Sequence, residues 1–351
     1  MCSYGDDADP SNPLANCAFR ANASLRGSTS VLGGSTKLES DCPPELCNGL
    51  LSQDRRSNPD FARWSKVFVN YCDGLSFTGD RDDPVPTGFG GQQIWLRGKR
   101  ILQAVLAALA KDHGLANAKR IIVSGNSAGG LTVYLHLDQI AAMLKELAPQ
   151  AEVYGFPDGG YFLDVANTKG VHTFREKMDA TFRLSNGSSG VDPACLAQHM
   201  TTPTDCLFAQ HMAPLLKTPF FGLEAQYDSW QISNVLELTC DKSTSASCMS
   251  KFQSFRDSMY KLFQPVIDKA ALIPPPGKLR NGVFFGACAV HCEATVDGGA
   301  IWSGDGTRNY TVPVGPTGRT VAMAFGDCYF GRSGGCSSVD VVRWPSNPSC
   351  K

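Results

Sequence analysis

Between Arg120 and Gly130 the chain reads Arg-Ile-Ile-Val-Ser-Gly-Asn-Ser-Ala-Gly-Gly. A short apolar run leads into a glycine-rich turn, and a helical pattern over about residues 130–147 follows it. The turn contains G-x-S-x-G, which is typical of a strained strand-to-helix turn that exposes a serine hydroxyl. Because the bare pattern is common by chance, its position between a strand and a helix carries the prediction that Ser127 is a nucleophile.

The segments around this turn alternate between strand and helix patterns. Residues 64–72 resemble a buried strand, and apolar positions over 95–109 repeat at helical spacing until about Gly114. This alternation predicts parallel βαβ units and an α/β class. No repeat or low-complexity linker interrupts the chain, so residues 1–351 are expected to form a single domain. Further strands are expected at 153–156, 219–225 and 283–287, and a helical stripe at 252–263.

Composition narrows the class of protein. Of the 351 residues, 42% are hydrophobic and 19% are charged, which allows a sizeable core and excludes a disordered or fibrous chain. Lys and Arg number 32 against 33 Asp and Glu, so the net charge of −1 provides no electrostatic case for nucleic-acid binding. No apolar run reaches the roughly 18 residues of a membrane span.

Cysteine usage indicates an oxidising compartment. The chain has 14 cysteines, an even number that is high for a reducing cytosol, and none lies in a paired zinc pattern. Together with the sequons at Asn22, Asn186 and Asn309, this predicts a secreted protein. Residues 1–20 lack a leader pattern, so we expect a leader to have been removed or the natural start to lie elsewhere. The cysteines at short separation are Cys2/Cys17, Cys42/Cys47, Cys195/Cys206, Cys240/Cys248 and Cys328/Cys336.

A serine nucleophile needs a histidine base that a carboxylate orients. On this fold the order along the chain should be serine, acid, histidine, with each residue at the end of a strand. His291 fits, because it follows the run 283–287 and lies between Cys288 and Cys292, which are expected to brace its loop. The other downstream histidines lack a preceding strand: His172, His199 and His211.

Asp228 is the preferred carboxylate, because it follows the strand pattern at 219–225. Asp158 and Asp164 remain alternatives, and any single aspartate can instead serve as a turn or cap residue. The amide of Ala128 lies at the start of the following helix, where it would point at a developing oxyanion. The predicted site residues are therefore Ser127, Asp228, His291 and, for the oxyanion, Ala128.

With these residues marked, the chain resembles the pectin acetylesterase family, which also contains the Wnt-deacylating hydrolase Notum. The resemblance covers nearly all 351 residues, and its ordered blocks are far more specific than G-x-S-x-G alone. The segment Tyr-Asp-Ser-Trp-Gln-Ile is closer to plant-type members than to Notum. The blocks are Asn16-Cys-Ala-Phe-Arg20, Arg26-Gly-Ser28, Asn58-Pro-Asp-Phe61 with Trp64, Tyr71-Cys-Asp-Gly-Leu-Ser-Phe-Thr-Gly-Asp80, Ser124-Gly-Asn-Ser-Ala-Gly-Gly130, Asp158-Gly-Gly-Tyr-Phe-Leu-Asp164, Ala225-Gln-Tyr-Asp-Ser-Trp-Gln-Ile232, Ala287-Cys-Ala-Val-His-Cys292 and Gly326-Asp-Cys-Tyr-Phe330.

The resemblance implies an α/β-hydrolase-like fold, with a mostly parallel sheet flanked by helices, and it implies the same roles for Ser127, Asp228 and His291. The chain departs from the family pattern at Asn126, where plant members often have cysteine. It also begins at Met1-Cys2, where the family block Leu-Glu-Gly-Gly-Gly-Trp-Cys should be ending, so we expect a truncated N-terminus that lacks the first strands and the glycine oxyanion donors. Losing one such donor typically costs ~10²–10³ in rate.

Three hypotheses follow. The first is a secreted serine carboxylesterase that removes acetyl groups from a cell-wall polysaccharide such as pectin and needs no metal or organic cofactor. The second keeps the chemistry and takes a lipid-like or protein-linked acyl ester, as the Notum branch implies. The third is a non-catalytic extracellular binding protein on a degenerate hydrolase scaffold. The sequence does not decide the sugar position or the oligomeric state.

Overall fold

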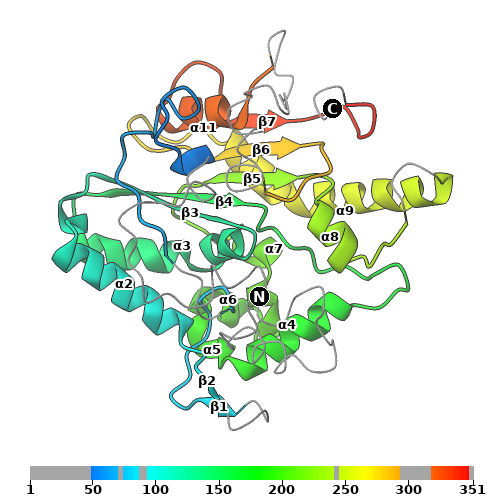
Figure 1. Cartoon of the computed structure of the whole chain (residues 1–351), viewed down its shortest axis with the longest axis horizontal. Helices are drawn as coiled ribbons and strands as arrows, with labels where there is room; N and C mark the ends of the chain where they lie inside the picture. The colour runs from blue at the N-terminus through cyan, green and yellow to red at the C-terminus, as the bar shows by residue number, and fades with distance from the viewer. Residues whose placement is uncertain (1–48, 70–73, 87–92, 241–244, 293–317, 348–351) are drawn as a thin grey trace.

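The computed structural model describes residues 49–69, 74–86, 93–240, 245–292 and 318–347 (Figure 1). Its centre is a five-stranded sheet in the order β3-β4-β5-β6-β7, and every neighbouring pair of strands is parallel. A separate two-stranded antiparallel sheet pairs β1 with β2. The strands are β1 (Val85–Pro86), β2 (Gln93–Ile94), β3 (Arg120–Asn126), β4 (Glu152–Asp158), β5 (Phe221–Ala225), β6 (Gly282–Gly286) and β7 (Ser337–Val339).

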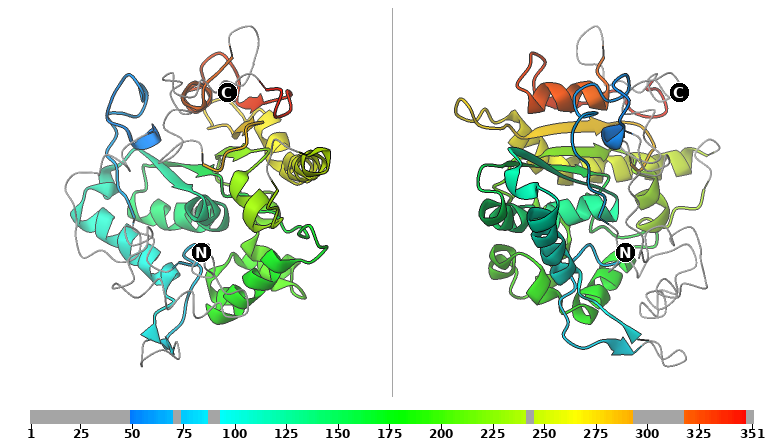
Figure 2. Two further views of the ribbon diagram at one scale, coloured as in Figure 1. Left: turned by 45° about the vertical axis from the view of Figure 1, so that its right-hand side comes forward. Right: turned by 60° about the vertical axis from the view of Figure 1, so that its left-hand side comes forward.

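Helices cover both faces of the parallel sheet. Figures 1 and 2 show α3 and α11 on opposite sides of it, and α9 packs against β6. The α-helices are α2 (Gly98–Asp112), α3 (Ala128–Leu147), α4 (Thr173–Leu184), α5 (Gly187–Gly190), α6 (Pro193–Gln198), α7 (Ala209–Met212), α8 (Ser229–Asn234), α9 (Ala246–Ala271) and α11 (Val321–Tyr329), with 3-10 turns η1 (Gly49–Leu51), η2 (Leu115–Asn117) and η3 (Pro203–Leu207).

The alternation of side chains along each strand produces these layers. In β6, Val283 and Phe285 belong to a core cluster with residues of α3 and α9, whereas Phe284 belongs to a second cluster with residues of α11. Successive strand residues point to opposite faces, so a strand buried on both faces reads as a continuous apolar run. The short apolar runs of the sequence are therefore the strands of a three-layer α/β sandwich.

Most predicted elements are confirmed, with small shifts at their ends. The helix expected over 95–109 is α2, and the one expected over 130–147 is α3. The stripe at 252–263 is part of the longer α9. Three of the cysteine pairs at short separation form disulfides, whereas Cys2/Cys17 and Cys42/Cys47 lie outside the described residues. The three are Cys195–Cys206, Cys240–Cys248 and Cys328–Cys336.

The strand predicted over residues 64–72 is wrong for its described part, residues 64–69, which pair with no other described strand. Val67 is 54% exposed and Phe68 is 45% exposed, so neither lies in the core. The ammonium group of Lys66 donates hydrogen bonds back to the carbonyl oxygens of Phe61 and Ala62, and this contact holds a compact turn. An apolar segment gains little stability from an extended conformation when no neighbouring strand pairs with it.

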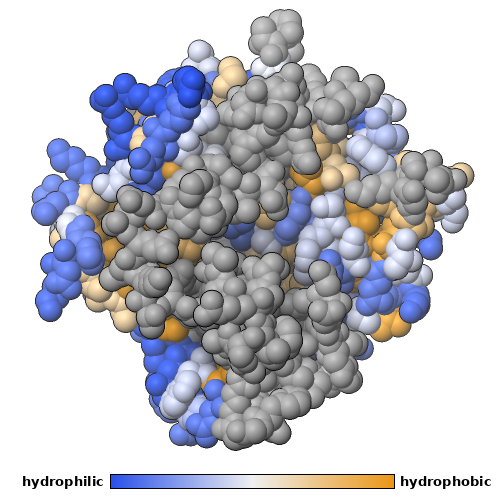
Figure 3. Space-filling model, in the orientation of Figure 1, coloured by the Kyte–Doolittle hydropathy of each residue, from blue (hydrophilic) through white to orange (hydrophobic). Residues whose placement is uncertain are grey.

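The described surface mixes polar and apolar residues, which Figure 3 shows for one face. Among the described helices, including the long α3 and α9, none combines the length and apolar character that crossing a membrane requires.

Candidate functional site

Ser127 occupies the sharp turn between β3 and α3. Its φ of 54° and ψ of −121° lie in a region that residues with side chains rarely adopt. The turn depends on its small neighbours, since a Cβ added at Gly125 would lie 2.4 Å from the backbone carbon of Gly129. The Ser127 amide donates to the carbonyl oxygen of Asp158 at 2.8 Å, which ties the turn to the end of β4. The serine hydroxyl therefore stands at the carboxyl edge of the sheet.

The structure brings His291 and Asp228 to this serine. His291 follows β6, and its Nε2 lies 2.8 Å from Ser127 Oγ. Its Nδ1 lies 2.8 Å from Oδ2 of Asp228, a fully buried carboxylate at the end of β5. The amide of Gln231, in α8, donates to Oδ1 of Asp228 at 2.8 Å. With Nδ1 protonated toward Asp228, Nε2 is free to accept the serine proton.

Ala128 is the first residue of α3, so its amide is one of the free donors at the helix N-terminus. Its carbonyl oxygen accepts a hydrogen bond from the Ser76 hydroxyl at 2.9 Å. This contact fixes the first turn of α3 against a loop that lies 52 positions earlier in the chain. The Ala128 amide is thereby held beside Ser127.

Two aromatic side chains border His291, and the sequence prediction did not assign a role to either. Trp230, in α8, stacks on the imidazole with ring centroids 5.9 Å apart and planes at 27°. Phe162 lies 6.1 Å from the imidazole and 5.1 Å from Trp230. Both residues stand in blocks that carry the family resemblance, which was the only available signal. They limit how far the imidazole can rotate away from Ser127.

The cysteines that flank His291 differ in state. Cys288 is disulfide-bonded, whereas Cys292 is a free, buried thiol. Both were expected to brace the loop, but Cys292 does not do so through a disulfide. Burial, followed by the negative charges of Asp158 and Asp228, raises the pKa of the Cys292 thiol well above its usual value. Cys292 packs next to Gly159, 3.2 Å from the position of an added Cβ there, and it also interacts with the backbone of Ser127.

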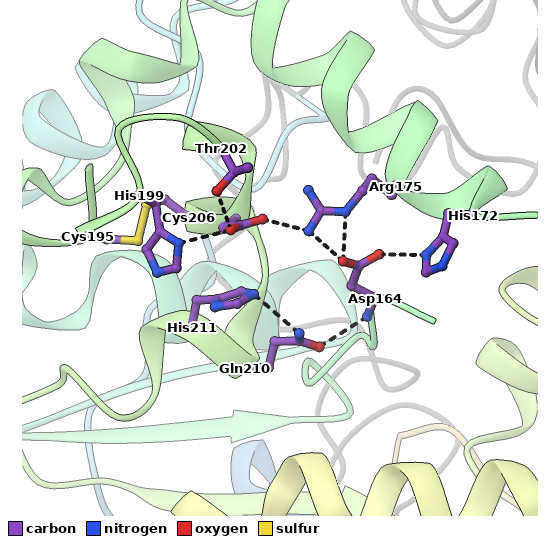
Figure 4. A network of polar contacts seen from close by, with 10 residues as sticks. Asp164, His172, Arg175, Cys195, His199, Thr202, Cys206, Gln210 and His211 are labelled. Atoms are coloured by element: carbon purple, nitrogen blue, oxygen red, sulfur yellow. Dashed lines mark hydrogen bonds and ion pairs between the residues drawn. A yellow bond between two sulfur atoms is a disulfide. The ribbon is translucent and has the colours of Figure 1, made fainter. Parts of the chain in front are cut away.

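Of the alternative residues, Asp158 is the last residue of β4, where its carbonyl oxygen accepts a hydrogen bond from the Ser127 amide. The others lie in a polar network within the segment that connects β4 to β5 (Figure 4). The Asp164 carboxylate accepts a hydrogen bond from Nε of Arg175 at 2.7 Å and lies 3.3 Å from Nδ1 of His172. The side chain of Gln210 connects the Asp164 amide, 3.1 Å away, to Nε2 of His211, 3.3 Å away. Asp164 and His172 thus contact each other directly, whereas His211 is connected to them only through Gln210.

One group in this network has the residue types of a metal site. His199, Asp205 and His211 offer ligand atoms that lie within 4.8 Å of one another. Both carboxylate oxygens of Asp205 already accept hydrogen bonds, at 2.6 Å from Arg175, 2.7 Å from Thr202 and 2.9 Å from His199. The Arg175 charge would oppose a second cation at this distance. We therefore interpret the group as a structural anchor for the segment between β4 and β5.

Comparison with known proteins agrees with the resemblance seen in the sequence. A family model described as Pectinacetylesterase matches residues 14–351. Pectin acetylesterase 11 of Arabidopsis thaliana is 35% identical over 312 residues, which cover 86% of this chain and 74% of that protein. Palmitoleoyl-protein carboxylesterase NOTUM of Drosophila melanogaster is 30% identical over 243 residues, covering 68% of this chain and 34% of that protein.

The fold has a counterpart among solved structures. The structure of the Wnt deacylase Notum from Drosophila superposes with a TM-score of 0.72 at 21% identity, covering 90% of this chain and 82% of that one. The parallel sheet with a serine on its strand-to-helix turn is the predicted α/β-hydrolase fold. From the family model, the identity to Arabidopsis relatives and the shared fold, we conclude that this chain belongs to the Pectinacetylesterase family.

Proposed function

We propose that this chain is a serine carboxylesterase that hydrolyses acyl esters through Ser127, His291 and Asp228. The supporting observation is the continuous series of short contacts from Ser127 Oγ through both imidazole nitrogens to the Asp228 carboxylate. Relatives named as pectin acetylesterases and palmitoleoyl-protein carboxylesterases support ester hydrolysis as the reaction class.

The proposed reaction proceeds through an acyl-enzyme. Nε2 of His291 takes the Ser127 proton while Oγ forms a bond to the carbonyl carbon, and the Ala128 amide stabilises the resulting oxyanion. Asp228 stays ionised and stabilises the imidazolium. The imidazolium gives its proton to the departing alcohol, and His291 then deprotonates a water that releases the carboxylic acid and restores Ser127. This sequence of steps needs no metal and no organic cofactor.

For the substrate, we propose an acetyl ester on a cell-wall polysaccharide such as pectin. The 35% identity to an Arabidopsis pectin acetylesterase supports this choice over other esters. Three disulfides between cysteines close in sequence support a secreted, extracellular location, because such bonds persist in oxidising compartments.

A longer acyl ester on a protein is the second candidate. The superposition on the Wnt deacylase Notum, with a TM-score of 0.72, favours it, since both chains share one scaffold. The two candidates differ in acyl chain length and therefore in the apolar pocket that the reaction requires.

The test compares release of carboxylate from acetylated pectin, an aryl acetate, an aryl octanoate and a palmitoleoylated peptide. Ser127→Ala is the decisive variant, and Ser124→Ala, which changes an exposed serine of the same strand, is its matched control. We expect acetate release that Ser127→Ala abolishes and Ser124→Ala preserves. Hydrolysis of only the long-chain esters would favour the second candidate, and no turnover of any ester would leave a binding role.

A further inference from the structure

A second carboxyl group lies directly beside the acid of the proposed triad. Glu224 is in β5, and Asp228 follows four residues later, three positions after the strand ends, as the N-cap residue of α8. The Glu224 side chain is 1% exposed and lies close enough to the fully buried Asp228 carboxylate for the charge of Asp228 to act on it. The amide of Tyr161 donates to its Oε2 at 2.9 Å, and the amide of Ala225 lies 3.3 Å from its Oε1. Glu224 is therefore held rigidly below the carboxylate that contacts His291.

The largest charge effects on Glu224 among the described residues come from other carboxylates. Asp228 is the strongest influence, and Asp158, at the end of β4, also acts on Glu224. Tyr134 in α3, Tyr161 after β4 and Cys292 after β6 are the other neighbours whose ionisation the Glu224 charge affects. Within the described residues, no lysine or arginine forms an ion pair with Glu224.

These surroundings decide which carboxyl group holds a proton. Two adjacent carboxylates buried without a cation cannot both be ionised at moderate cost. Asp228 faces His291, the group that becomes positive during the proposed reaction, whereas Glu224 has no basic partner among its described contacts. Burial, and then the Asp228 charge, raises the pKa of the Glu224 carboxyl well above its usual value.

We propose that Glu224 remains a neutral carboxylic acid and donates a hydrogen bond to the Asp228 carboxylate, which makes it a positioning residue of the site. This inference rests on the proposed function. Asp228 then receives three donors, from Glu224, from the Gln231 amide and from His291. Together they hold Oδ2 toward the imidazole, and the Glu224 donor reduces the negative charge that Asp228 presents to His291.

The first test compares the pH dependence of kcat/KM for Glu224→Gln and Glu224→Leu. Glutamine keeps a neutral donor of the same shape, so we expect its acidic limb to stay within a few tenths of a pH unit of the wild type. Leucine removes the donor, so Asp228 stabilises the imidazolium more and the acidic limb moves to higher pH. For Glu224→Leu we also expect kcat to fall about 10- to 100-fold with little change in KM, as for the loss of a hydrogen bond to a charged group.

An ionised Glu224 would give a different result for Glu224→Gln. Glu224→Gln would then remove a negative charge next to Asp228, and the acidic limb would move to lower pH by about one unit. That result would overturn the proposal. If Glu224→Leu fails to fold, Glu224→Gln alone still separates a neutral from an ionised Glu224, because only an ionised Glu224 predicts a shift of the acidic limb for this isosteric variant.

A second readout does not depend on ester hydrolysis. Infrared difference spectra of wild type minus Glu224→Gln at neutral pH should contain the carbonyl stretch of a protonated carboxylic acid. Absence of that band would overturn the proposal even in an active esterase. Conversely, ester hydrolysis that survives Ser127→Ala would contradict the proposed triad. If the carboxylic acid band were present in the same protein, the protonation of Glu224 would still be supported, so the two failures are distinguishable.

Discussion

Acidification below neutral pH should destabilise the fold through the buried His136. This residue lies in α3 and is only 2% exposed, and its Nε2 is 2.9 Å from the carbonyl oxygen of Ser76. Ser76 has a positive φ of 53° and also donates to Ala128, the residue after the proposed nucleophile. Burial lowers the pKa of His136 from 6.5 to about 4, although the hydrogen bond to Ser76 partly opposes this shift.

The sign and size of the effect follow from proton linkage. In the unfolded chain His136 titrates near pH 6.5, whereas in the folded chain it stays neutral until about pH 4. Between these values the unfolded state binds a proton that the folded state does not. The contribution of His136 to the free energy of unfolding is therefore fully present above pH 6.5, and it is lost as the pH falls to about 4. A difference of this size, at about 1.4 kcal/mol per unit, corresponds to about 3 kcal/mol.

The assay is urea unfolding of the wild type and His136→Gln at a series of pH values. Glutamine is neutral throughout and has an amide that can donate to Ser76, so all other titrating groups cancel in the comparison. We expect the wild type to lose about 3 kcal/mol more than the variant between pH 7 and pH 4. Parallel curves, within about 0.5 kcal/mol, would show that the folded chain accepts the proton without cost and would refute the reasoning.

Further predictions concern the turn after β3 and one disulfide. Gly130→Ala should lower the free energy of unfolding by about 1–3 kcal/mol in urea titrations, because its Cβ would lie 2.5 Å from the Asp158 carbonyl oxygen. Gly129→Ala, with no atom within 4 Å, should instead be neutral or stabilising by up to about 1 kcal/mol, and equal losses for both variants would contradict the steric argument. Replacing Cys195 and Cys206 with serine removes a bond that spans 11 positions and should lower thermal and urea stability by about 3 kcal/mol; a variant as stable as the oxidised wild type would count against the bond.

Local patterns were sufficient to predict the turn that carries Ser127. Strand, turn and helix follow one another directly in that segment. Their signals, the spacing of apolar residues and the small residues of the turn, can be read from positions that are close in the sequence. Helices α2 and α3 were predicted for the same reason. The cysteines of Cys195–Cys206 and Cys240–Cys248 are only 11 and 8 positions apart, so the sequence indicated pairs that are easily bridged, but it left the connectivity open.

Distant contacts depended on which strands lie side by side. His291 is 164 positions from Ser127 and 63 from Asp228, and they meet only because β3, β5 and β6 are parallel and end at the same edge. Residues 64–69 show the converse, since a strand-like pattern without a pairing neighbour stays irregular and exposed. The environment of Glu224 is also tertiary, because its burial and the charges of Asp228 and Asp158 near it depend on how the chain folds, and these determine whether a carboxyl group keeps its proton.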